Sequence, residues 1–134
     1  MSYDLTVRLS RQNMPTPSAW RAAIIEAGFP VQLDSDFDVE TFAGFLPAPA
    51  HGEQSGFEYY ARHISVEEAQ RAKLDAGIDF AITFSISSRP LELVSALAAA
   101  SVLAAISGGT LKNPQEGNSY SASEAVEWTR AQIG

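Results

Sequence analysis

The stretch IDFAITFSISSRPLELVSALAAASVLAAI, residues 78–106, decides the fold because its first part has a strand pattern and its second part a helix pattern. Phe80, Ile82, Phe84 and Ile86 alternate with small or hydroxyl-bearing residues, and this period of two predicts a strand with one buried face. Residues 91–106 follow as an Ala-rich run that is apolar nearly all round, which predicts a buried helix. Alanine permits a close approach to a sheet, so we expect this helix to lie centrally on one sheet face.

The flanking sequence adds further elements to this pair. Residues 3–9 alternate like a half-buried strand, and residues 57–64 are aromatic-rich and strand-like. Thr16, Ser65 and Ser121 are expected N-caps of three helices, and Gly28 is the expected end of the first of them. Shorter strands are expected at residues 31–33, 42–46 and 110–112.

Runs of neighbouring strands favour an antiparallel or mixed sheet over a doubly wound one. The sequence therefore predicts a single α+β domain over residues 1–134. We expect a mostly antiparallel or mixed sheet of about five strands with three main helices, and helix 91–106 packed centrally on one face.

Composition excludes several classes of chemistry. The 134 residues include no cysteine, so disulfides, thiolate metal sites and thiol catalysis are impossible. The formal net charge is −7, and phosphate backbones repel such a surface, so no nucleic-acid partner is expected. Residues 91–106 are shorter than the ~20 residues that span a bilayer. No leader pattern is visible at the N-terminus, so we expect a cytoplasmic protein without a membrane partner.

Motifs for catalysis and cofactor binding are absent. The chain has no phosphate-binding glycine loop, no G-x-S-x-G elbow and no H-E-x-x-H pair. Asp34, Asp36 and Asp38 resemble the start of a calcium loop, but Val39 and Phe45 stand where that loop needs Gly and a bidentate Glu. We therefore assign no catalytic residue, no metal ligand and no cofactor.

The acidic segment 34–40 is the strongest candidate for a binding site. Its carboxylates recur at every second position, so an extended chain would display them on one side. One interpretation is a solvated loop or an edge strand that charge keeps soluble. The other is a docking strip for a cationic partner, anchored by the aromatic ring at position 37. The candidate partner-binding residues are Asp34, Asp36, Phe37, Asp38, Glu40, Tyr59 and Tyr60.

The C-terminal third carries a resemblance to known proteins. The Ala-rich helix ends in ISGG (106–109), and NPQEG (113–117) precedes a helix with Ala125 and Trp128. This pattern resembles small bacterial α+β proteins that look like immunity proteins of polymorphic toxins. The resemblance implies a non-catalytic, protein-binding domain that neutralises a cognate toxin, and we expect that partner to be basic. It carries no catalytic residues.

A second interpretation is a small enzyme or ligand-binding domain. Its site would be assembled from scattered polar residues around His63, with Tyr59, Tyr60, Arg62 and Glu58 nearby in the sequence. Strand alternation places Glu58 and Arg62 on the face opposite His63, which disfavours a direct pairing. A deep polar cleft with perturbed histidines or carboxylates favours this second interpretation, and a shallow acidic or aromatic patch favours the first.

Overall fold

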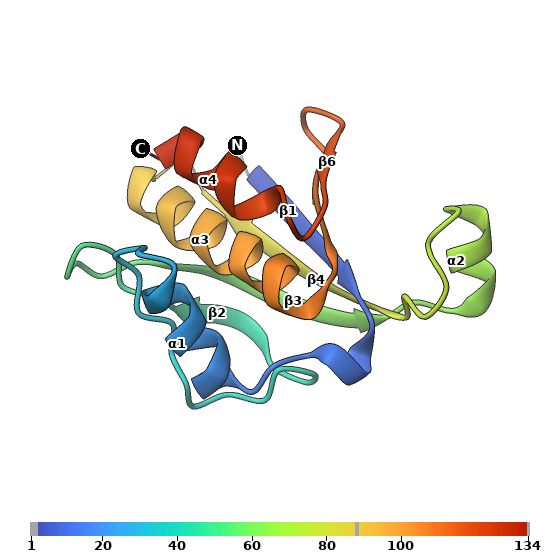
Figure 1. Ribbon diagram of the computed structural model, residues 1–134. Coiled ribbons are helices and arrows are strands. Elements are labelled where there is room, and N and C mark those ends of the chain that lie inside the picture. Colours follow the sequence, from blue (N-terminus) through green and yellow to red (C-terminus); the bar gives the residue numbers. More distant parts are fainter. Residues whose placement is uncertain (1–2, 88, 134) are drawn as a thin grey trace.

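A computed structural model describes residues 3–87 and 89–133 and confirms the α+β prediction (Figure 1). Its strands are β1 (Tyr3–Leu9), β2 (Ala43–Pro47), β3 (Gly56–His63), β4 (Phe80–Ile86), β5 (Thr110–Asn113) and β6 (Asn118–Tyr120). Its helices are α1 (Pro17–Glu26), α2 (Val66–Arg71), α3 (Pro90–Ser107) and α4 (Ala125–Ile133), with a 3₁₀ turn at Arg11–Asn13.

The strands form one antiparallel sheet in the order β2-β3-β4-β1-β5-β6. The sheet has six strands where about five were predicted, because residues 118–120 pair with β5 after the NPQEG turn. The strand expected at residues 31–33 is wrong, since Val31 makes only an isolated bridge with Ala50. The remaining predicted strands are found with small shifts at their ends.

Helix α3 lies across one face of the sheet, with α1 and α4 beside it (Figure 1). Alanines 96, 98, 99, 100 and 104 are buried along it, and their small side chains permit close packing. The indole Nε1 of Trp20 on α1 donates a hydrogen bond to the Ala99 carbonyl at 3.0 Å. The hydroxyl of Thr129 on α4 donates to the Leu97 carbonyl at 3.4 Å. The prediction of a central, buried Ala-rich helix is confirmed.

Length and composition alone would let α3 cross a bilayer. Its 18 residues have a mean hydropathy of 1.7, and 61% of them are buried against the rest of the chain. A core helix of this kind passes the same test as a membrane span. Burial of α3 against the sheet accounts for its apolar character.

The opposite face of the sheet, which we call the open face, carries polar and aromatic side chains. Its members alternate with the core residues of each strand and are mostly exposed or partly exposed. They are Asp4, Thr6, Arg8, Ala43, Phe45, Glu58, Tyr60, Arg62, Ala81, Thr83, Ser85, Thr110, Lys112 and Ser119. Helix α2 stands away from the body of the sheet at the far end of β3 and has no buried residue (Figure 1).

Candidate functional site

The acidic segment 34–40 forms a loop between α1 and β2, not an extended strand. Asp34 Oδ1 accepts the backbone N–H of Asp36 at 3.2 Å, and Asp38 Oδ1 accepts the N–H groups of Glu40 at 2.9 Å and Thr41 at 3.2 Å. These local bonds turn the chain, as aspartates often do. The expected row of four carboxylates on one side of a strand is therefore wrong.

Phe37 belongs to an aromatic cluster and is not a free anchor. Its ring centroid lies 5.4 Å from that of Tyr59, 5.8 Å from that of Phe42 and 6.4 Å from that of Trp20. Such spacings are typical of tilted and edge-to-face aromatic pairs. Phe37 is only partly exposed, and its ring contacts fix the loop to the core. The assignment of Phe37 as the anchor for a partner is therefore wrong.

Tyr59 also holds the loop from inside. Its side chain is fully buried, and its hydroxyl donates to the Val39 carbonyl at 2.5 Å. Burial raises the pKa of Tyr59, and the nearby carboxylates of Asp38 and Glu40 raise it further. A buried phenol cannot touch a partner, so the assignment of Tyr59 to the binding surface is wrong.

The four carboxylates of the loop differ in their exposure and in their contacts. Asp36 and Asp38 are exposed, while Asp34 and Glu40 are partly buried. Arg11 Nη1 lies 3.1 Å from Glu40 Oε1, in an ion pair that closes the end of the loop. The N–H of Asp34 donates to the Pro47 carbonyl at 3.0 Å, which places the start of the loop beside the edge strand β2.

The open face at the β2 edge of the sheet carries an aromatic pair, of which the sequence analysis assigned only Tyr60 to a binding surface. Tyr60 is 47% exposed and Phe45 is 50% exposed, and both lie on the open face. Ala43 pairs with Tyr60, and Phe45 pairs with Glu58, so the two aromatic residues are diagonal neighbours on adjacent strands. The sequence does not predict an exposed Phe45, because AGFLP (43–47) shows no alternation of polar and apolar residues.

Gly56 lets the Phe45 ring lie over the start of β3. A Cβ at position 56 would stand only 2.6 Å from Cζ of Phe45, so any larger residue would displace the ring. A hollow of about 720 Å³ adjoins the same ring, and Pro47, Pro49 and Leu91 are among its lining residues. Phe45 is therefore an exposed aromatic on a surface that continues to the start of α3.

Residues around His63 do not assemble into one site. His63 packs edge-on against Phe80, with ring centroids 5.1 Å apart. Glu58, Tyr60 and Arg62 lie on the open face, where Arg62 forms two hydrogen bonds with Glu68 at 2.7 and 2.9 Å. The Arg62 guanidinium lowers the pKa of Glu68, which accounts for this perturbed carboxylate as part of an ion pair.

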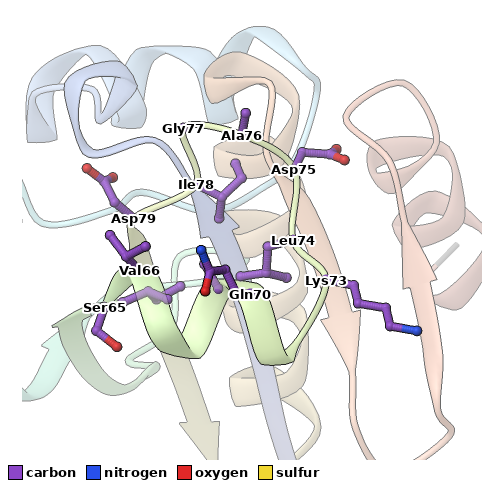
Figure 2. Close-up of a pocket in the computed structure, with 12 residues that line it drawn as sticks. Ser65, Val66, Gln70, Lys73, Leu74, Asp75, Ala76, Gly77, Ile78 and Asp79 are labelled. Atoms are coloured by element: carbon purple, nitrogen blue, oxygen red, sulfur yellow. The ribbon is translucent and has the colours of Figure 1, made fainter.

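A further hollow of about 530 Å³ lies between α2 and the loop at residues 72–79 (Figure 2). Ile64, Val66, Leu74 and Ile78 give it a largely apolar lining. Figure 2 shows Lys73 pointing away from this hollow, toward the strands on its far side. Within residues 3–87 and 89–133, no three acidic or histidine side chains lie close enough together to hold a metal ion.

No protein-family model, curated protein or solved structure matches this chain. Function is therefore inferred from the side chains that the fold presents. The best candidate for a binding surface is at the edge strand β2, and we call it the β2 surface. It combines Phe45 and Tyr60 on the open face with Asp34, Asp36, Asp38 and Glu40 of the loop that packs against Tyr59 on the opposite face.

Proposed function

We propose that this chain is a non-catalytic protein-binding domain that neutralises a basic bacterial toxin through its β2 surface. The observation that carries the proposal is the half-exposed pair Phe45 and Tyr60 on adjacent strands of the open face. Aromatic residues are enriched among the residues that dominate binding energy. Two such rings side by side at a sheet edge are a suitable apolar centre for an interface.

Charge supports the choice of a basic partner. Asp36 and Asp38 are exposed on a loop that Phe37 and Tyr59 fix to the core, so the loop does not need to be ordered on binding. Preorganised groups lose less conformational entropy on association. Carboxylates at the same sheet edge as an aromatic centre raise the association rate with a cationic partner and help to fix its orientation.

The nature of the hollows supports binding over catalysis. Among the residues that the structure describes, no histidine lines the hollow beside Phe45, and the polar residues near His63 are divided between the two faces of the sheet. The lowered pKa values of Glu68 and Glu124 follow from an ion pair and from hydrogen bonds with Ser121 at a helix start. The C-terminal pattern of residues 106–128 supports the same class of protein by its resemblance to immunity proteins.

Co-expression tests the proposal. The chain is expressed together with the toxin candidate encoded by the adjacent gene, and growth of the bacterial host is measured. We expect the wild-type chain to restore growth and Phe45→Asp to lose the rescue. Ile106→Asp is the matched control, because Ile106 is 44% exposed at the end of α3, which leads into β5, and three strands separate β5 from β2 in the sheet. A purified toxin that forms no complex with the chain, or equal rescue by both variants, would contradict the proposal.

A further inference from the structure

A third hollow, on the open face, gathers cations in an otherwise acidic chain. It has a volume of about 300 Å³ and lies between residues 72–75 after α2 and the strands β1, β5 and β6. Three of the chain's nine basic residues line it. The polar lining residues are Arg8, Lys73, Asp75, Thr110, Lys112 and Ser119.

The sheet register holds two of these cations close together. Arg8 pairs with Thr110, and Lys112 pairs with Thr6 and Ser119, so Arg8 and Lys112 are diagonal neighbours on one face. Like charges at such positions repel each other unless an anion lies between them. In the part of the chain that the structure describes, the ion pairs within 4.0 Å join Arg11 to Glu40 and Arg62 to Glu68, so neither includes these two cations.

Glu68 is the carboxylate that most needs to be considered as a partner for Arg8. The charge of Arg8 contributes to lowering the pKa of Glu68, but the hydrogen bond from Arg62 is the main cause. Glu68 is held by both guanidinium nitrogens of Arg62. Glu68 is therefore already paired with Arg62. Asp75 is the carboxylate that lines the hollow itself.

Lys73 reaches the hollow from a backbone position that normally favours glycine. Its φ of 56° is left-handed, and it occupies the turn that ends α2. The N–H of Leu74 donates to the Ala69 carbonyl at 2.9 Å, and that of Lys73 to the Gln70 carbonyl at 3.2 Å, which is the Schellman pattern. Helix α1 ends in the same pattern with Gly28 at this position. A strained lysine beside two other cations points to a role outside folding.

We propose that Arg8, Lys73 and Lys112 form a binding site for a doubly charged oxyanion, either inorganic phosphate or the phosphate group of a small monoester. Three cations and the Asp75 carboxylate leave two net positive charges, which match a phosphate dianion. The hydroxyls of Thr110 and Ser119 add neutral donors to the charged ones. This site does not depend on the proposed toxin binding at β2, so either proposal can fail alone.

The test uses the full chain and two probes, inorganic phosphate and phenyl phosphate. Amide chemical shifts are followed by ¹H–¹⁵N NMR at low ionic strength as each probe is added. We expect saturable shifts at Arg8, Lys73 and Lys112, and about tenfold weaker binding in Lys73→Gly and in Lys112→Gln. Tighter binding of phenyl phosphate identifies an ester as the ligand, and equal binding identifies the free ion.

The matched control is Arg89→Gln, which removes the same charge from an exposed arginine outside this hollow. It should bind both probes as tightly as the wild-type chain. The proposal is overturned if shifts rise linearly to about 50 mM phosphate, as expected of nonspecific screening. It is equally overturned if Arg89→Gln weakens binding as much as Lys112→Gln does. Lys73→Gly is expected to fold normally, because glycine suits its backbone angle, and thermal melting verifies this.

Discussion

At the scale of single residues, Tyr59 joins the core to the acidic loop. Its hydroxyl is the donor to the Val39 carbonyl, and its ring lies in the cluster with Phe37 and Phe42. Tyr59→Phe keeps the ring and removes one hydrogen bond, which leaves the carbonyl without this donor. We expect a loss of about 1 kcal/mol in the free energy of unfolding at pH 7, measured by urea denaturation. An unchanged free energy would show that water replaces the hydroxyl.

The same residue predicts a dependence of stability on alkaline pH. Burial raises the pKa of Tyr59 in the folded state above its ordinary value of 10.0. Its contribution to stability is therefore complete below about pH 10, the unfolded value, and is lost as the pH rises above it, because the unfolded chain then releases a proton that the folded chain retains. The wild-type chain should lose more stability between pH 9 and 11 than Tyr59→Phe does. Parallel losses in both proteins would assign the effect to other tyrosines.

Lys73 offers a substitution that improves the fold while removing a charge. A left-handed backbone costs an L-residue roughly 1 kcal/mol relative to glycine. Lys73→Gly should raise the free energy of unfolding by up to about 1 kcal/mol, reduced by the greater freedom of glycine in the unfolded chain. Thermal and urea denaturation measure this change. Lys73→Ala is the control, because it removes the same charge but retains the strain, and it should give no gain.

At the scale of elements, α3 contributes eight buried hydrophobic residues to the core, more than any other helix or strand. Leu97 is 1% exposed on this helix, whereas Ile106 near its end is 44% exposed. Leu97→Ala should lower the free energy of unfolding by roughly 2–5 kcal/mol, because it leaves a cavity in the core. Ile106→Ala should cost much less, since its side chain is half in water. Similar losses for both variants, measured by urea denaturation, would contradict the packing of α3 against the sheet.

Local signals accounted for most elements and for their ends. Thr16 accepts the N–H of Ala19 at 3.2 Å and Ser65 accepts that of Glu68 at 3.1 Å, so two expected caps are confirmed. The alternation at Phe80–Ile86 and the apolar run of α3 also gave correct elements, because burial on one face imposes those periods. Helix α2 ends at Arg71, because the chain turns at Lys73.

The candidate site was harder to predict because its side chains are placed by contacts between distant segments. Residues 33–40 alternate like a strand, yet Phe37 is drawn into the core by Trp20 and Tyr59, which no local pattern reveals. Phe45 gave no signal, since its exposure follows from the edge position of β2. The cations of the third hollow come from β1, β5 and the turn after α2, so only the strand order brings them together.

At the scale of the whole molecule, the sheet separates two kinds of surface. One face holds the helices and the core, and the open face carries the aromatic pair at its β2 end and the cationic hollow toward β5 and β6. Although the net charge is −7, acidic and basic side chains are therefore unevenly distributed over the surface. Such a distribution lets one domain attract a basic protein at one edge while it binds a small anion elsewhere.

This separation makes the acidic loop testable apart from stability. Asp36→Asn with Asp38→Asn removes two exposed charges, and asparagine at 38 retains the oxygen that accepts the N–H groups of Glu40 and Thr41. We expect a lower association rate with the proposed basic toxin and a weaker dependence of that rate on salt, at an almost unchanged melting temperature. Stopped-flow mixing at several ionic strengths measures the association rate and its dependence on salt. The double variant Glu116→Gln with Glu127→Gln changes the net charge equally at exposed positions outside the loop, and it should leave the rate close to that of the wild-type chain. If the two double variants slow association equally, overall charge governs the encounter and the loop is only a solvated edge.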